Sequence, residues 1–285
     1  PPAPRGYWNR DLPDQWASVT SAEGSARLTA HTGRRVFLQR AGNGAAVDLS
    51  AEELTCSAFV PGGRRFVAGS LDGRVRLYDV ETGRSVSLLF PHEAPVTGVA
   101  VSPNGRFAAS GTETGTVMLS DIASGATLGT WAEADLPITA VRFSPNGRLL
   151  AVAAGDWRIK DSGRITLLEV EAESLVPRTV LPAWSAFSAI EFTAGGDRLL
   201  AADGIGQVTA WALATSEEIL LGTIDKNLVE EARFSPDVRF ADRIEPLPAP
   251  QVEAPIQTFG FPGPFLPTQS AAVSTTFPDG RIDDK

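Results

Sequence analysis

Residues 102–106 read SPNGR, and residues 144–148 read SPNGR again. The flanks repeat as well, since VTGVAVSPNGRFAASG at 96–111 aligns without a gap with ITAVRFSPNGRLLAVA at 138–153. A Pro-Asn-Gly corner between two alternating apolar segments is typical of a tight turn that joins two strands, because Pro fixes φ and Gly accepts a positive φ. The interval of 42 residues between the two copies therefore predicts a repeat architecture.

Four further turns of this kind extend the period in both directions. They begin at residues 21, 60, 193 and 235, so successive turns are separated by 39, 42, 42, 49 and 42 residues. Each unit has the same order: an alternating segment, the turn, a short apolar strand, a second turn with Gly, a third strand and a fourth. Apolar periodicity near two and frequent turns predict an all-β chain. Four strands per unit of this length are typical of a β-propeller blade.

The repeats resemble those of the WD40 family. The residues that carry the resemblance are Tyr78-Asp79 and Ser120-Asp121 at the Trp-Asp position, Trp211 at the same place in a later unit, Asp72-Gly73 in the preceding turn, and His92 at the Gly-His position. The resemblance covers about residues 16–240 and is strongest over 53–223. It implies a propeller of four-stranded blades, six or seven in number and incomplete or open, with extended Pro-rich terminal arms. The expected domains are an N-terminal arm at 1–15, a propeller at 16–240 and a C-terminal arm at 241–285.

The sequence also departs from the family pattern. No Trp-Asp pair is intact, and no blade contains the complete set of His, Ser, Asp and Trp that hydrogen-bonds in this family. We therefore expect packing and ordinary ladder bonds to hold the blades together. Four blades are clear, a first at 16–50 is degenerate, and a sixth beginning at 228 is partial. Either the termini close the ring in an irregular way or the ring is open, and an open ring leaves an edge strand to be covered.

One insertion interrupts the repeat. The second turn of the fourth blade expands to GDWRIKDSG at 155–163, and it carries Trp157, Arg158 and Lys160. The family resemblance implies that this loop lies on the face that usually binds partners, beside the loop with His92. A variable surface hairpin is one interpretation. A docking loop is the other, because Trp and Arg are common interface anchors.

The second interruption is the C-terminal segment. From about residue 241 the repeat is lost and prolines follow one another every few residues, which excludes interior strands. A solvated linker would not be expected to contain Phe259, Phe261, Phe265 and Phe277. We therefore expect this arm to bind either its own propeller or, as the favoured interpretation, another subunit. The N-terminal PPAPRGYWNRDLP has a similar character, and the same expectation applies to it with less force.

Composition limits the function classes. The formal net charge of −9 argues against a nucleic-acid partner, which would need a basic face. Cys56 is the only cysteine, so neither an internal disulfide nor a cysteine-built metal site is expected. No apolar run approaches the length of a membrane helix. The chain begins without Met, which suggests a processed chain or part of a longer one. The compartment stays open, with the cytoplasm favoured over export.

No catalytic motif emerges from the sequence. The histidines are His31 and His92, the second at the family's structural position, and neither H-E-x-x-H nor G-x-S-x-G occurs. Acidic loops such as AEADLP at 132–137 are interpreted as solvated. The sequence therefore predicts no cofactor and no metal.

Two function classes remain, and the favoured one is a non-catalytic scaffold for other protein subunits of an assembly. Its candidate partner-binding residues are Trp157, Arg158, Lys160, His92, Phe259, Phe261 and Phe265. The alternative is an enzyme or small-ligand binder with a site at the channel mouth. A chain that forms the sensory or docking end of a longer polypeptide is a third possibility.

Overall fold

The computed structural model describes residues 15–223, apart from short gaps at 32–34, 42–45, 133–135, 157, 160–161, 172–173, 183–185 and 204–206. The C-terminal arm expected at 241–285 and the partial sixth blade expected from 228 lie outside the described residues. The N-terminal arm expected at 1–15 does so too, except for Gln15. The domain boundaries therefore stay predictions.

The described chain forms five antiparallel sheets of four strands, each in chain order. Sheet 1 contains β1 (Gln15–Thr20), β2 (Ala26–His31), β3 (Arg35–Arg40) and β4 (Val47–Asp48). Sheet 2 contains β5 (Leu54–Phe59), β6 (Arg65–Ser70), β7 (Arg74–Asp79) and β8 (Ser85–Pro91). Sheet 3 contains β9 (Val96–Val101), β10 (Phe107–Thr112), β11 (Thr116–Asp121) and β12 (Thr127–Ala132).

Two further sheets complete the described chain. Sheet 4 contains β13 (Ile138–Phe143), β14 (Leu149–Ala154), β15 (Arg164–Val170) and β16 (Leu175–Pro182). Sheet 5 contains β17 (Phe187–Phe192), β18 (Arg198–Asp203), β19 (Gln207–Ala212) and β20 (Glu217–Thr223). A 3-10 turn, η2 (Ser50–Glu52), joins sheets 1 and 2, and the described residues contain no α-helix.

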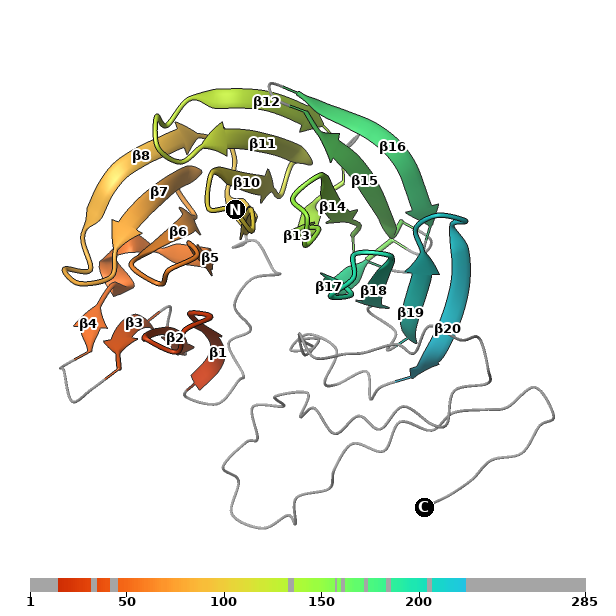
Figure 1. Cartoon of the computed structure of the whole chain (residues 1–285). Helices are drawn as coiled ribbons and strands as arrows, with labels where there is room; N and C mark the ends of the chain where they lie inside the picture. The colour runs from red at the N-terminus through yellow and green to blue at the C-terminus, as the bar shows by residue number, and fades with distance from the viewer. Residues whose placement is uncertain are drawn as a thin grey trace, which may run out of the picture.

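The five sheets lie side by side in an arc, with the first strand of each sheet toward the centre and the fourth at the periphery (Figure 1). Sheet 1 is at one end of the arc and sheet 5 is at the other. The prediction of an all-β propeller of four-stranded blades, incomplete or open, is thereby confirmed for the described residues. The first blade, expected to be degenerate, has all four strands, although its fourth strand spans only Val47–Asp48.

The recurring pentapeptide forms the turn that the sequence predicts. Ser102 Oγ lies 2.7 Å from Asn104 Oδ1, and the same hydroxyl accepts a hydrogen bond from the Phe107 amide at 2.8 Å. The Asn104 side chain accepts from the Arg106 amide at 3.0 Å, and Gly105 has φ +72. Ser144, Asn146 and Gly147 repeat this arrangement in the next sheet. The sequence repeats here because both turns need the same side-chain bonds and the same left-handed corner.

These turns also stack on one another from sheet to sheet. A Cβ atom placed on the glycine would lie against the proline of the preceding turn, at 3.5 Å for Gly105 and Pro61, 3.7 Å for Gly147 and Pro103, and 3.4 Å for Gly196 and Pro145. Sheets 1 and 2 are joined differently, because the Gly62 amide donates to Glu23 Oε1 at 2.9 Å. The turns therefore help to position neighbouring sheets.

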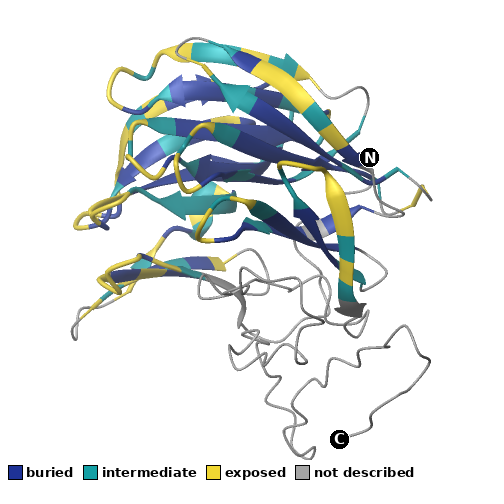
Figure 2. Cartoon of the chain, turned by 45° about the vertical axis from the view of Figure 1, so that its right-hand side comes forward, coloured by how far each residue is buried: buried dark blue, intermediate teal, exposed yellow. Residues whose placement is uncertain are grey.

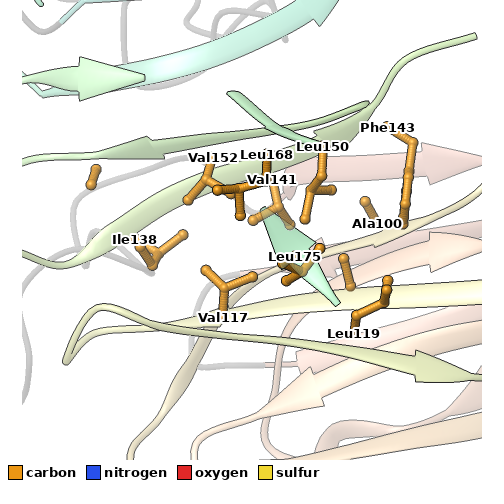
Figure 3. Close-up of a cluster of buried hydrophobic side chains, with 12 residues drawn as sticks. Ala100, Val117, Leu119, Ile138, Val141, Phe143, Leu150, Val152, Leu168 and Leu175 are labelled. Carbon is orange, nitrogen blue, oxygen red and sulfur yellow. The ribbon is translucent and has the colours of Figure 1, made fainter. Parts of the chain in front are cut away.

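The hydrophobic core lies between the sheets. Between sheets 3 and 4, Ala100 and Leu119 pack with Ile138, Leu150 and Leu168 (Figure 3). Full burial of each large aliphatic side chain contributes about 1.5–3 kcal/mol. Figure 2 shows this pattern as buried inner strands, with the exposed residues concentrated on the peripheral strands and in the turns.

Candidate interaction surface

His92 lies in the connection between β8 and β9, and its side chain is buried. Its Nε2 is 2.6 Å from Ser110 Oγ, and its ring meets the Phe90 ring edge-on at a centroid distance of 5.4 Å. Its amide donates to the carbonyl oxygen of Gly73 at 2.8 Å, which ties the loop to the β6–β7 turn. Desolvation lowers the pKa of His92 to about 4, so the ring is neutral at pH 7. These contacts favour a structural role, and partner binding by His92 stays a prediction.

Sheet 3 contains only part of the family's hydrogen-bonded set. Ser120 takes the place where the family has Trp, and its hydroxyl is buried without a hydrogen-bond partner among the described residues. His92 Nδ1 is likewise buried and unpartnered within the described part of the chain. The pair His92–Ser110 is therefore all that remains of the set in this sheet.

In sheet 2 a different arrangement replaces the missing Trp. Tyr78 is buried, its ring stacks on that of Phe66 at 4.9 Å, and its hydroxyl donates to Glu52 Oε2 at 2.9 Å. Desolvation and the hydrogen bond to Glu52 raise the pKa of Tyr78. Arg76 donates to Ser70 Oγ at 2.9 Å and to Asp72 Oδ2 at 2.8 Å.

The Asp72 carboxylate is the acceptor at the centre of this arrangement. Desolvation alone would raise its pKa, but the hydrogen bonds from Arg76, Ser70 and Arg74 together outweigh that effect and lower the pKa. All of these partners belong to the same sheet, so the cluster stabilises the β6–β7 turn.

Threonines on the innermost strands link sheet 2 to sheet 3 and sheet 3 to sheet 4. Thr55 Oγ1 lies 3.0 Å from the carbonyl oxygen of Gly69 in its own sheet and 2.6 Å from that of Val96 in sheet 3. Thr97 repeats this contact with Gly111 at 3.1 Å and with Ile138 at 2.5 Å. The sequence analysis did not identify these residues, although their 42-residue spacing was a signal that could have revealed them.

Sheets 4 and 5 are linked by an ion pair on the same inner strands. Arg142 Nε on β13 lies 3.3 Å from Glu191 Oε2 on β17, and the two side chains are 31% and 36% exposed. Cys56 on β5 is also on an inner strand, and desolvation raises the pKa of its thiol to about 11. The thiol is therefore protonated at pH 7.

These inner-strand groups do not assemble into a recognisable reaction centre. The described residues contain no group of three or more His, Cys, Asp or Glu side chains placed to hold a metal ion. Within the same ranges, no helix is long and apolar enough to cross a membrane. The alternative of a ligand site at the channel mouth stays a prediction.

Several hydrogen bonds join the described residues of the inserted loop between β14 and β15. Ser162 Oγ accepts from the Asp156 amide at 3.0 Å and lies 2.9 Å from the Asp156 carbonyl oxygen. The Asp156 carboxylate accepts from Arg158 Nε at 2.8 Å and from its Nη2 at 2.6 Å. Hydrogen bonds from the Arg158 side chain and amide hold the pKa of Asp156 below its usual range. The loop presents Arg158 with 85% of its side chain exposed and Ile159 with 54% exposed.

Of the predicted partner-binding residues, the structure describes only His92 and Arg158. The inserted loop and the β6–β7 turn that contacts His92 both join the second and third strands of a sheet, so they lie at the same end of their sheets. At that end, the inserted loop lies next to the connection before β17, because a Cβ on Gly155 would lie 2.8 Å from Ala186 Cα. Trp157, Lys160, Phe259, Phe261 and Phe265 lie outside the described residues, and their roles stay predictions.

A second exposed feature was not foreseen from the sequence. Val86 and Leu88 alternate along the peripheral strand β8, and they are 52% and 50% exposed. Both lie in SVSLLF at 85–90, a segment without charge or proline. An uncharged edge strand with aliphatic side chains is available for contact with another chain. The signal was present in the sequence, but periodicity alone does not distinguish the peripheral strand from the buried ones.

The geometry defines a class of protein. Within the described residues, five four-stranded sheets lie in an arc around a common centre and are linked by repeated turns and inner-strand contacts, which is the architecture of an incomplete or open β-propeller. The family model described as WD domain, G-beta repeat matches residues 48–79, 83–121 and 125–160. This match supports the assignment of these repeats to the WD40 family, and they are degenerate at the Trp-Asp position.

A solved structure supports the fold. The crystal structure of the Myceliophteria thermophila Cps50 (Swd1) β-propeller domain matches with a TM-score of 0.51 and 24% sequence identity. The match covers 59% of this chain and 54% of that one, so the chain spans about half the length of the structure it matches. No curated protein matches the sequence significantly.

Proposed function

We propose that the chain is a non-catalytic scaffold that holds other protein subunits, as a structural or accessory subunit of a larger complex. WD40 propellers are in general non-catalytic interaction scaffolds. The observation that carries the finer proposal is the inserted loop, which is ordered by Asp156 and Ser162 and displays Arg158 beside Ile159. Residues that are already held by hydrogen bonds lose less conformational freedom when a partner binds.

The exposed groups of this loop define the chemistry of the partner segment. A guanidinium has five N–H donors, and Asp156 accepts from Nε and Nη2 of Arg158. Donors therefore remain for a carboxylate of the partner. The adjacent Ile159 fits an apolar side chain. The loop thus suits a segment in which an acidic residue stands next to an aliphatic or aromatic one. Trp157 and Lys160 would extend the same surface.

The C-terminal arm is the second part of the proposal. Residues 241–285 combine frequent prolines with Phe259, Phe261 and Phe265. Prolines restrict the conformations of the free chain, so an arm of this composition loses less entropy on binding than a flexible one. We infer that the phenylalanines insert into pockets of another subunit.

The experiment compares proteins captured from native extract by the full chain and by three variants. R158A/I159A removes the exposed side chains of the loop. R178A/V180A is the matched control, because Arg178 is a salt-bridged arginine that is 58% exposed and Val180 is 55% exposed, both on β16. The third variant lacks residues 241–285.

We expect R158A/I159A to lose a defined partner that R178A/V180A retains, and the truncated chain to lose a partner of its own. Equal recovery of every partner by all four chains would contradict the proposed docking surfaces. Mass spectrometry of the retained proteins identifies the partners directly.

A further inference from the structure

The β5–β6 turn and the β7–β8 turn meet at one corner of sheet 2, which carries the exposed residues Arg64, Arg65 and Arg84. The Val80 amide donates to the Arg64 carbonyl oxygen at 3.0 Å. The Asp79 amide donates to the Arg84 carbonyl oxygen at 3.0 Å, and Arg65 is paired with Asp79 across β6 and β7. Three arginines therefore surround the same two backbone residues.

The carboxylates at this corner already have partners. Glu23 of sheet 1 accepts from a backbone amide of the β5–β6 turn at 2.9 Å. Asp79 accepts from the Thr82 amide and from its hydroxyl, both at 2.9 Å. Glu81 accepts from Arg40 of sheet 1 at 2.8 Å. Within the described ranges, the side chains of the three arginines at the corner form no hydrogen bond and no salt bridge, so their donors remain for a partner.

The corresponding corner of sheet 3 is different. Arg106 there is the equivalent of Arg64, but its guanidinium lies 4.8 Å from the centre of the Phe107 ring. Its Nε is also 3.2 Å from Asp121 Oδ2. The other two positions are occupied by Phe107 and Ala126. Sheet 3 thus uses its single arginine internally, whereas sheet 2 leaves three available.

Exposed aliphatic side chains continue from the arginine corner. The uncharged strand β8 begins directly after Arg84, and Val86 and Leu88 on this strand are 52% and 50% exposed. The peripheral strand of sheet 3, β12, is also uncharged, but its Leu128 and Trp131 pack against the core between sheets 3 and 4. Sheet 2 therefore places exposed aliphatic groups beside arginines that have no partner among the described residues.

The edge of β8 does not suit the addition of another strand. Its pairing with β7 shifts register in two places. The β11–β12 turn of sheet 3 lies against the same edge, because a Cβ on Gly125 would lie 3.6 Å from the Leu88 carbonyl oxygen. Bulges and covering loops protect an edge strand from pairing. A partner would therefore contact the side chains of this region and not its backbone.

We propose that this region is one docking surface, the sheet 2 surface, which binds an acidic and aliphatic peptide segment of another protein. The surface consists of Arg64, Arg65, Arg84, Val86 and Leu88. Carboxylates of the segment bind the arginines, because guanidinium and carboxylate match in charge and in hydrogen-bonding geometry. Aliphatic side chains of the segment cover Val86 and Leu88.

Charge and length agree with such a ligand. The chain has a formal net charge of −9, so an acidic segment is repelled by most of its surface and directed to the corner where arginines are available. The distance along the strand from Arg84 to Leu88 is about 13 Å, which a short extended segment can span. The inference rests on the proposed scaffold role only in that the ligand is a protein, and it uses neither the inserted loop nor residues 241–285.

The probe is a library of random peptides displayed on phage. Selection is made on the full chain with R158A/I159A, so that the inserted loop does not contribute. We expect enrichment of peptides in which Asp or Glu stands next to Leu, Ile or Val. The dissociation constant of the most enriched peptide is then measured by fluorescence anisotropy with the wild-type chain and its variants.

Two variants remove the two halves of the sheet 2 surface. R64A/R84A removes charge, and V86S/L88S removes the aliphatic groups. Each should weaken peptide binding about fivefold or more. Their melting temperatures should stay close to the wild-type value, because all four side chains are exposed.

Matched controls change the same kinds of residue on sheet 4. R148A/R178A removes two exposed arginines, and V176S/V180S removes two valines that are 38% and 55% exposed. Both controls should bind the peptide as tightly as the wild-type chain. Equal weakening by the sheet 2 and sheet 4 variants would show unspecific attraction and overturn the proposal.

Other outcomes also decide the question. Selection without acidic and aliphatic peptides, or an enriched peptide that binds R64A/R84A and V86S/L88S normally, would overturn the proposal. A dimer of the full chain in sedimentation velocity that these variants dissociate would assign the surface to a second copy and would also overturn it. Peptide binding to the sheet 2 surface, combined with equal recovery of every partner from extract by the loop and arm variants, would contradict only the docking surfaces proposed above.

Discussion

The hydroxyl of Thr97 lies 2.5 Å from the carbonyl oxygen of Ile138, which belongs to the next sheet. The same hydroxyl lies 3.1 Å from the carbonyl oxygen of Gly111 in its own sheet. A hydroxyl has one proton, so both carbonyls share a single donor. One buried side chain thereby fixes the distance between two innermost strands.

Thr97→Val is expected to destabilise the protein by about 1–2 kcal/mol, because the two buried carbonyls lose their common donor while the shape of the side chain is preserved. The free energy of unfolding from urea titration measures this loss. Thr139→Val is the control, since Thr139 has only one such contact, at 3.4 Å to the Ala153 carbonyl oxygen. Equal losses in the two variants would show that the contact between sheets is unimportant.

Gly111→Ala is expected to destabilise the protein by about 1–3 kcal/mol through overpacking. The added methyl group would lie 2.4 Å from Ile138 Cγ2. Gly98→Ala in the adjacent strand provides the comparison, because the atom nearest to its methyl group is Val141 Cγ2 at 3.5 Å, an ordinary contact. Thermal unfolding distinguishes the two variants, and a neutral Gly111→Ala would mean that sheets 3 and 4 can separate without cost.

His92 predicts a dependence of stability on pH. Burial lowers the pKa of His92 to about 4 from its ordinary value of 6.5, so between these pH values the unfolded chain binds a proton that the folded chain excludes. Stability therefore falls as the pH decreases from 6.5 to 4, by an amount on the order of 3 kcal/mol for this group.

Replacement of the titrating ring isolates this effect. His92→Gln should weaken the decrease in unfolding free energy between pH 7 and pH 4.5, whatever its stability at pH 7. Urea titrations of both chains at the two pH values give the comparison. An unchanged pH dependence would indicate that His92 is accessible to protons in the folded protein.

Two buried serines of sheet 3 should respond in opposite ways to removal of their hydroxyls. Ser120→Ala is expected to be neutral or stabilising by up to about 1 kcal/mol, because its buried hydroxyl has no partner among the described residues. Ser110→Ala is expected to cost about 1–3 kcal/mol, because it leaves His92 Nε2 unpaired. The melting temperature of Ser120→Ala should equal or exceed that of the wild-type protein, and the melting temperature of Ser110→Ala should lie clearly below it.

The sequence predicted the architecture because turns and periodicity are local properties. Ser102, Asn104 and Gly105 determine their corner through bonds within a few residues, and such bonds do not depend on the rest of the fold. The arc of blades followed from the spacing of these corners, whereas the closure of the ring could not be predicted, because the repeat is lost from about residue 241.

The interaction surface was less predictable because its features depend on contacts between distant residues. Thr97 reads as an ordinary strand residue until Ile138 of the next sheet is placed beside it. Arg158 could be predicted as a partner-binding residue because arginine is common at interfaces. The position of its guanidinium depends on Asp156, which Ser162 in turn contacts. The exposure of Val86 and Leu88 follows from the peripheral place of β8, which alternation does not encode.

The contacts between neighbouring sheets have a consequence for synthesis of the chain. Thr55 and Val96 are 41 residues apart, as are Thr97 and Ile138, and Arg142 and Glu191 are 49 apart. A newly made sheet therefore finds its docking partner in the sheet completed just before it, and need not wait for the C-terminus. Assembly can proceed from the N-terminal end while translation continues, as expected for chains whose units contact only their neighbours. The growing end face remains exposed throughout, and each new sheet covers it in turn.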